Sequence, residues 1–369
     1  MEHRFYMPVR LVVGENCIEK NSAYLRDLGT RCLIVTGRTS AKACGALDDV
    51  TRALDKEGIE WDVFNKIGPN PLASVCAQGG RAAAAFGADF IIGIGGGSPL
   101  DAAKAVAAYA ANDMELMDIY KPHKVPALPL VLVGTTAGTG SEVTRYSILT
   151  QDETGRKVSW GNDRSYARIS FGDPRYTATQ SHSTTVSTAL DALSHAVESY
   201  FLSNSNDFSE AYSLLAIQKI LPALQKLRDG AEPDLAMRDD LYIGSIYGGM
   251  AIDITGTAFC HFMGYVLTER CNVPHGQACA AYLPDFIDHC TLAAPQKAQR
   301  LYTTVNMFAG PLRRLVEDLT DTSFPAFSAE DIDALMPIWS AAKNMPLVPG
   351  FSAEKQHKIA MRVLGNGRK

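Results

Sequence analysis

Asp191 and His195 are the residues of this sequence whose types and spacing most directly suggest chemistry. They lie four residues apart within 188–198, a stretch whose other positions are mostly apolar. Two residues at this spacing share one face of a helix, and the apolar neighbours indicate that the helix is buried. A buried carboxylate beside an imidazole is costly unless both groups have partners. Either a hydrogen-bonded core pair or a divalent cation bound by both residues meets that requirement.

Two later histidines, His261 and His275, could complete a set of four ligands. A straight helix from one to the other would separate them by about 21 Å, too far for one ion. The sequence Asn272-Val-Pro274 interrupts any such helix, so the chain can fold back. Three imidazoles and one carboxylate suit Fe²⁺ or Zn²⁺ and leave room for a substrate oxygen. We therefore expect a metal site, although ligand type alone does not choose between iron and zinc.

The first half of the chain alternates short apolar runs with helical patterns. We expect strands at 31–36, 61–64, 89–94 and 127–133, a helix that ends at Gly58 and another at 74–86. Continuous apolar strands separated by helices indicate a parallel sheet covered on both faces. The runs 146–149, 157–160 and 168–171 predict added strands or a hairpin around 152–155.

The pattern changes after about Thr177. Helical segments then predominate, at 187–200, 208–227, 235–252, 278–289, 295–309, 329–342 and 353–364. We expect an α/β dinucleotide-binding domain over residues 1–177 and an all-α metal-binding domain over residues 178–369.

A glycine-rich turn follows the third expected strand and includes Gly96 and Gly97. Ser98 suits a helix N-cap, Pro99 suits the first helical position, and Asp101 approximates a capping box. Because a helix N-terminus presents free amides, we favour phosphate binding here over a plain tight turn, and we include Asp101 in the cofactor site. The turn is not the Gly-x-Gly-x-x-Gly fingerprint, because Ser98 stands at its last glycine.

A second loop, at 134–144, mixes glycines with small hydroxyl residues after the fourth expected strand. This position suits contacts with a diphosphate and a ribose in the sheet crevice. The alternative is an ordinary Ser/Thr turn.

Composition excludes several classes of protein. A formal net charge of -5 gives no basic surface for nucleic acid, and no apolar run reaches the ~20 residues of a membrane span. The eight cysteines are scattered and the N-terminus lacks a signal-peptide core. We expect a cytoplasmic enzyme without nucleic-acid or membrane partners.

Four ordered motifs resemble those of the iron-containing (group III) alcohol dehydrogenases, over nearly the whole chain. They lie at 95–104, 134–144, 191–198 and 274–276. The resemblance implies a Rossmann-like α/β N-terminal domain, a helical C-terminal domain and an active site in the cleft between them. It also implies a homo-oligomer, a dimer.

The resemblance also implies which residues bind the metal and the nucleotide. The metal ligands would be Asp191, His195, His261 and His275. The nucleotide contacts would be Asn70, Gly96, Gly97, Ser98, Thr135, Thr136, Thr144 and Lys157.

The sequence departs from the family pattern in two places. Many members carry a further histidine where Tyr265 stands, near the substrate. Tyr265 is therefore a candidate catalytic residue that could donate a proton, or else a packed aromatic. NAD-preferring relatives often carry an acid where Gly37 stands, and without it Arg38 and Ser40 could receive a 2′-phosphate. We favour NADP(H) over NAD(H), the alternative being that Arg38 points into solvent.

These features predict a metal-dependent alcohol dehydrogenase or aldehyde reductase that transfers hydride between NAD(P)(H) and a small alcohol or aldehyde. Two alternatives are a dehydroquinate-synthase-like lyase on the same fold and a non-catalytic binder of metal and nucleotide. The sequence does not identify the substrate or the physiological direction.

Overall fold

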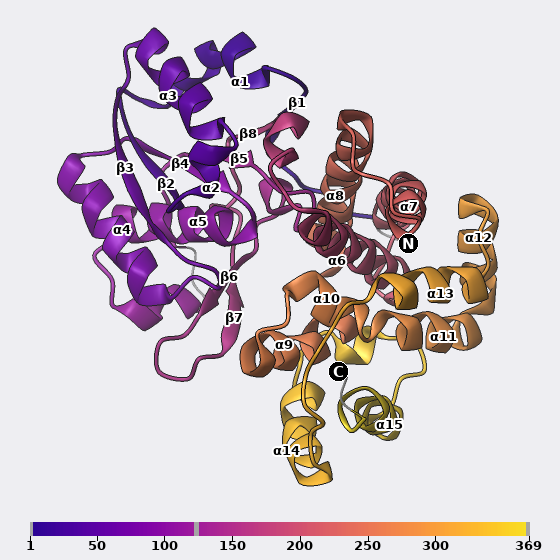
Figure 1. Cartoon of the computed structure of the whole chain (residues 1–369). Coiled ribbons are helices and arrows are strands. Elements are labelled where there is room, and N and C mark those ends of the chain that lie inside the picture. Colours follow the sequence, from indigo (N-terminus) through magenta and orange to yellow (C-terminus); the bar gives the residue numbers. More distant parts are fainter. Residues whose placement is uncertain (1–2, 122–124, 367–369) are drawn as a thin grey trace. The chain divides into compact units, whose positions relative to one another are not determined.

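The computed structural model describes residues 3–121 and 125–366 (Figure 1). These residues form two compact units, one spanning Tyr6–Gln180 and the other running from Ser181 onward together with residues 3–5. The division follows Gln180, whereas the change of pattern in the sequence places it after Thr177. The first unit is α/β and the second is mostly helical, which confirms the expected fold class.

Six parallel strands form the main sheet of the α/β unit, in the order β1-β8-β5-β4-β2-β3. Their carboxyl ends therefore lie at one edge of the sheet. The strands are β1 (Arg10–Val13), β2 (Arg31–Gly37), β3 (Glu60–Ile67), β4 (Phe90–Gly95), β5 (Leu130–Gly134) and β8 (Ile169–Gly172).

Two strands differ from the expectation. β1 was not predicted, because it has only four residues, one exposed and three partly buried, which leave little periodicity. The run at 168–171 was expected as an added strand or part of a hairpin, but β8 is fully buried and pairs with both β1 and β5. The hairpin around 152–155 consists of β6 (Ser147–Thr150) and β7 (Lys157–Trp160), which pair antiparallel.

Helices cover both faces of this sheet (Figure 1). Leu33 and Val35 of β2 face one core with α4 (Ala73–Phe86) and α5 (Gly97–Ala111), while the intervening Ile34 faces the other. That second core contains residues of α1, η1 and α3. The remaining elements of the unit are α1 (Cys17–Lys20), η1 (Ser22–Leu28), α2 (Ser40–Ala43), α3 (Ala46–Glu57), η2 (Leu116–Tyr120), η3 (Ser141–Val143) and η4 (Pro174–Thr177).

The start of α5 corrects one expectation. The helix begins at Gly97 with Gly96 as its N-cap, and no side chain caps it. The expected cap at Ser98 and capping box with Asp101 are therefore wrong. The reason is that the chain turns helical immediately after β4, so Ser98 already lies inside the first turn.

In the helical unit, α6 packs against α7, α8, α9 and α10. The helices are α6 (His182–Phe201), α7 (Asp207–Arg228), α8 (Leu235–Thr255), α9 (Phe259–Cys271), α10 (His275–Ala280), α11 (Leu283–Ala293), α12 (Pro295–Val305), α13 (Ala309–Leu319), α14 (Ala329–Ser340), η5 (Met345–Leu347) and α15 (Ala353–Leu364).

The helices of this unit differ from the sequence expectation at three places. The segment expected as one helix at 278–289 is divided between α10 and α11, with Pro284 in the first turn of α11. The helix expected at 295–309 ends at Val305, because Asn306 adopts a left-handed conformation, and α13 follows separately. α9 was not predicted, although it carries His261.

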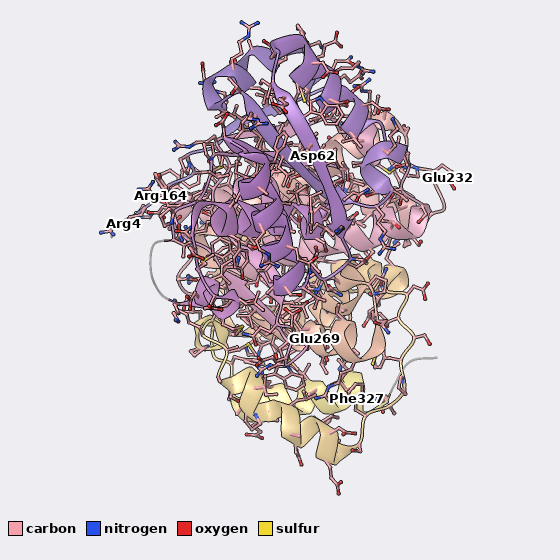
Figure 2. The ribbon with its side chains drawn as sticks, turned by 90° about the vertical axis from the view of Figure 1, so that its left-hand side faces the viewer. Arg4, Asp62, Arg164, Glu232, Glu269 and Phe327 are labelled. Carbon is pink, nitrogen blue, oxygen red and sulfur yellow. The ribbon has the colours of Figure 1, made fainter. Side chains whose placement is uncertain are left out.

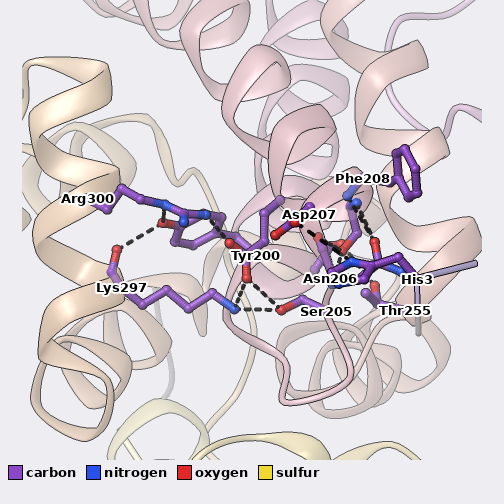
Figure 3. A network of polar contacts seen from close by, with 12 residues as sticks. His3, Tyr200, Ser205, Asn206, Asp207, Phe208, Thr255, Lys297 and Arg300 are labelled. Carbon is purple, nitrogen blue, oxygen red and sulfur yellow. Dashed lines mark hydrogen bonds and ion pairs between the residues drawn. The ribbon is translucent and has the colours of Figure 1, made fainter. Parts of the chain in front are cut away.

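Polar contacts connect elements of the helical unit that are distant in sequence (Figure 3). Lys297 Nζ of α12 lies 2.7 Å from Glu210 Oε1 of α7, and Arg300 also pairs with Glu210. At the other end of the network, His3 Nδ1 lies 3.8 Å from Asp207 Oδ2.

Charged side chains such as Arg4, Arg164 and Glu232 extend outward from the ribbon (Figure 2).

No single helix among the described residues is long and apolar enough to cross a membrane. Only α8 and α9 taken together pass that test, and the chain bends by 109° between them.

Candidate active site

Three helices of the second unit bring the expected metal ligands together. α6 supplies Asp191 and His195, α9 supplies His261 and α10 supplies His275. Close contact between α10 and α6 depends on Gly276, since a Cβ there would lie 1.8 Å from the carbonyl oxygen of Ser187. The left-handed Asn272 after α9 and Pro274 before α10 reverse the chain, so that His275 returns toward His261.

Donor atoms of three of these residues, Asp191, His261 and His275, lie close together. Asp191 Oδ1 lies 3.6 Å from His261 Nε2 and 3.8 Å from His275 Nε2. Ligands of one tetrahedral ion with bonds of ~2.0–2.1 Å lie roughly 3.4 Å apart, so these separations fit a single divalent ion. Asp191, His261 and His275, together with Cys279, offer ligand atoms that all lie within 4.8 Å of one another.

Two atoms of the cluster lack the partners that buried polar groups normally have. Asp191 Oδ1 and His261 Nε2 are both buried and have no hydrogen-bond partner. Burial alone would raise the pKa of Asp191, but His195, His275 and His261 lower it well below its ordinary value. The carboxylate is therefore anionic, and a cation would satisfy both orphaned atoms.

Glu198 is a hydrogen-bond partner of His261. Its carboxylate accepts hydrogen bonds from His261 Nδ1 and from the backbone N–H of Cys260, and its side chain is fully buried. In the neutral ring, a proton on Nδ1 would leave the Nε2 lone pair toward Asp191, as a metal ligand requires. Sequence reasoning assigned Glu198 no role, although it lies seven residues after Asp191 and so near the same helix face.

His195 and Cys279 occupy positions that differ from the expected ligand set. The ring of His195 stacks on that of His261 at 4.5 Å between centroids, and the compact donor cluster includes Cys279 instead of His195. Cys279 Sγ lies 3.8 Å from His275 Nε2. Sequence reasoning missed Cys279, although its spacing of four residues from His275 is the same helical spacing that pointed to Asp191 and His195.

Tyr265 lies beside the cluster on α9, half-buried. Its ring stacks on that of His275 with centroids 5.6 Å apart, and its other ring neighbour is Phe262 at 6.1 Å. The aromatic packing and the candidate proton-donating role are compatible, because stacking orients the ring and leaves the hydroxyl at its edge.

In the α/β unit, the two glycine-rich loops meet at the carboxyl edge of the sheet. The backbone N–H of Thr135 donates to the carbonyl of Gly95 at 2.9 Å. A Cβ on Gly96 would lie 2.8 Å from Thr136 Cγ2, and one on Gly97 would lie 2.6 Å from the methyl of Thr139. The glycines are thus required by loop packing, which is a reason for them beyond an approaching phosphate.

Asn70 joins this edge after β3, in a left-handed conformation. Its backbone N–H donates to Ser98 Oγ at 3.3 Å. Gly37 ends β2 at the same edge, and Arg38 follows it with an exposed side chain. The structure therefore brings Asn70, Gly96, Gly97, Ser98, Thr135 and Thr136 together, with Gly37 and Arg38 at the end of the strand beside β4.

Asp101, Thr144 and Lys157 lie in other surroundings. Asp101 accepts hydrogen bonds from Ser141 Oγ at 2.6 Å and from the backbone N–H of Ile148 at 2.9 Å. The fully buried Lys104 lies 3.6 Å from Asp101 and 3.4 Å from Thr144 Oγ1. Burial raises the pKa of Asp101, with Lys104 opposing it. The contacts of Asp101 fasten α5 to β6, whereas Lys157 opens β7 opposite Thr150.

Residues 8–174 match the family of iron-containing alcohol dehydrogenases, and residues 185–323 match the C-terminal part of the same family. A solved iron-containing alcohol dehydrogenase from Thermotoga maritima is 35% identical and aligns over 98% of this chain and 99% of its own with a TM-score of 0.90. This chain belongs to the iron-containing alcohol dehydrogenase family. It is an NAD(P)-dependent oxidoreductase that acts on alcohols or aldehydes.

Two further relatives differ in the cofactor that their names give. The NADPH-dependent butanol dehydrogenase of Clostridium saccharobutylicum is 28% identical over 86% of this chain and 81% of its own length. The probable NADH-dependent butanol dehydrogenase 1 of Bacillus subtilis is 28% identical over 98% of this chain and 93% of its own. Family membership therefore does not determine whether a member uses NADH or NADPH, and residues near the cofactor must determine it.

Proposed function

We propose that this chain reduces small aldehydes to alcohols with NADPH, using one divalent ion held by Asp191, His195, His261 and His275. The observation that carries this proposal is the donor cluster that contains Asp191, His261 and His275, in which Asp191 Oδ1 and His261 Nε2 are buried and lack hydrogen-bond partners, with the ring of His195 stacked on that of His261. Iron is the ion that the family description names, and zinc suits the same donor types. Such an ion supplies Lewis acidity toward a substrate oxygen.

The side chains around the cluster have distinct roles in this proposal. Asp191 contributes the negative charge, and Glu198 keeps His261 in the tautomer that binds through Nε2. Tyr265 would donate a proton to the carbonyl oxygen of the aldehyde, and a bound nicotinamide would supply the hydride. Its stacking on His275 keeps the ring in place for that transfer.

For the cofactor, we propose that the loops at 95–98 and 135–136 hold the diphosphate and that Arg38 holds the 2′-phosphate. Support comes from the position of Gly37 and Arg38 at the carboxyl end of β2, beside β4 and its glycine turn. A guanidinium offers a planar fork of donors for a phosphate, and Gly37 brings no carboxylate to repel it. A carboxylate at that position would instead favour NADH.

The test is steady-state turnover of short-chain aldehydes with NADPH and with NADH, for the protein loaded with iron or with zinc. We expect a higher kcat/KM with NADPH, and no turnover with either cofactor after the metal is removed. Persistent turnover by the metal-free protein would refute the metal-dependent mechanism.

Tyr265→Phe tests the proton donor, because it keeps the ring stacked on His275 and removes only the hydroxyl. General acid catalysis contributes about 10²–10⁴-fold, so we expect kcat to fall by about a hundredfold, with bound metal unchanged. Phe262→Leu is the matched control, since it disturbs the aromatic contact of Tyr265 and keeps its hydroxyl. A wild-type kcat in Tyr265→Phe would leave Tyr265 as a packed aromatic alone.

A further inference from the structure

Cys279 lies within the donor cluster although the family ligand set has no place for a thiol. Its Sγ lies 3.8 Å from His275 Nε2 and 3.9 Å from His275 Nδ1. It also lies within 4.8 Å of the ligand atoms of Asp191 and His261. Sulfur and nitrogen ligands of one tetrahedral zinc ion, with bonds of ~2.3 and ~2.1 Å, lie roughly 3.6 Å apart. The separation of Sγ from Nε2 is close to this value, and rotation of the Cys279 side chain away from Nδ1 would direct Sγ to the ion that the other residues bind.

The local fold determines this position. Cys279 follows His275 by four residues on α10, so the two side chains share one face of the helix. Gly264 of α9 allows α10 to lie close by, because a Cβ there would be only 3.0 Å from the carbonyl oxygen of Ala278. Cys279 is fully buried, and the orphaned atoms next to it are Asp191 Oδ1 and His261 Nε2.

We infer that Cys279 is an additional ligand of the metal ion in this chain, and that its sulfur shifts the selectivity of the site from iron toward zinc. This inference rests on the proposed function, because it concerns the same ion. Thiolate is a soft ligand that favours zinc, whereas imidazole and carboxylate accept either metal. The bond between sulfur and metal forms as the thiol releases its proton to solvent, without oxidation or reduction. With Asp191, the thiolate balances the two positive charges of the ion.

The first test uses cobalt as a spectroscopic substitute in the full-length protein. We expect the wild type with one bound Co²⁺ to show a thiolate-to-cobalt charge-transfer band in the near ultraviolet, and Cys279→Ser to lose it. Cys290→Ala is the matched control, because Cys290 is another buried thiol of this unit that lies outside the cluster, and it should keep the band. Bound cobalt with ligand-field bands but no thiolate band would overturn the inference and leave the proposed metal site standing. Failure of the wild type to bind cobalt would refute both.

The second test does not depend on a variant that folds. X-ray absorption of the zinc-loaded wild type should reveal one sulfur at about 2.3 Å, whereas nitrogen and oxygen neighbours alone would overturn the inference. In a competition between zinc and iron, we expect Cys279→Ser to reduce the preference for zinc by at least about tenfold. Loss of a hydrogen-bond partner of a metal ligand already lowers metal affinity by about 10–100-fold, and loss of the ligand itself should have at least that effect. An unchanged preference would contradict the role in selectivity.

Discussion

At the scale of single residues, the site uses two buried carboxylates for different purposes. Asp191 directs an unpartnered oxygen toward His261 and His275, whereas Glu198 has both of its contacts with donors of α9. Asp191 was predictable from the sequence, because its spacing to His195 places two ligand types on one helix face. The role of Glu198 was not predictable, since its partner lies on a helix that sequence periodicity did not reveal.

Glu198→Gln should weaken metal binding by about 10–100-fold, the usual effect of removing a partner behind a metal ligand. Glu198 now accepts from two donors, the backbone N–H of Cys260 and Nδ1 of His261. A glutamine would face one of them with its own N–H, and His261 would relieve this by moving its proton from Nδ1 to Nε2. Competition with a chromogenic chelator measures the affinity. Glu232→Gln, at an exposed position of the same unit, is the control and should leave the affinity unchanged. Equal affinity in both variants would exclude a positioning role.

Gly37→Asp should lower the affinity for NADPH relative to that for NADH by about 10- to 100-fold. The new carboxylate would repel a 2′-phosphate and replace a charge-assisted contact worth ~1.5–3 kcal/mol. The site can accept the side chain, because a Cβ at Gly37 meets its nearest atom, the carbonyl oxygen of Ile67, at 3.4 Å. Comparison of kcat/KM for the two cofactors provides the measurement, with Gly37→Ala separating charge from bulk. If the wild type, Gly37→Asp and Gly37→Ala show the same ratio of kcat/KM for NADPH and NADH, this loop does not recognise the 2′-substituent of the ribose.

At the scale of elements, the site depends on how closely α9 and α10 approach their neighbours. The sequence indicated α6 through its apolar periodicity and the chain reversal through Asn272 and Pro274. It did not indicate α9, whose apolar residues do not gather on one face and which is mostly buried. The division of the segment 278–289 into α10 and α11 was also missed, because alanines favour helix continuation and the break reflects tertiary packing.

Gly276→Ala should displace α10 from α6 and thereby impair both stability and metal binding. Its Cβ would overlap the backbone oxygen of Ser187, so the helices must separate. We expect the free energy of unfolding to fall by about 1–3 kcal/mol, the usual effect of overpacking, with less metal bound. Gly310→Ala on α13 is the matched control, because its Cβ would meet only a side-chain atom at 3.6 Å. Equal free energies of unfolding for the two variants, measured in denaturant, would contradict this account of the helix contact.

At the scale of the whole molecule, the proposed cofactor contacts and the proposed metal ligands belong to different units. The glycine-rich loops and Arg38 belong to the α/β unit, and the buried donor cluster belongs to the helical unit. The sequence predicts a change of unit near this point, because apolar runs give way to helical periodicity after about Thr177. The contacts of the Asp101 carboxylate with Ser141 and Ile148 were not predictable, because they arise from tertiary structure that a local motif does not encode.

His275→Ala tests most directly the central claim that turnover requires a metal held by this cluster. Metal content, NADPH affinity and aldehyde reduction are measured on the same purified variant, and circular dichroism confirms the fold. We expect bound metal to fall far below one ion per chain and kcat/KM to fall at least about a thousandfold, since Lewis-acid stabilisation is worth several kcal/mol. NADPH affinity should be unchanged, because its proposed contacts lie in the other unit. Near-normal turnover with one ion per chain would contradict the account.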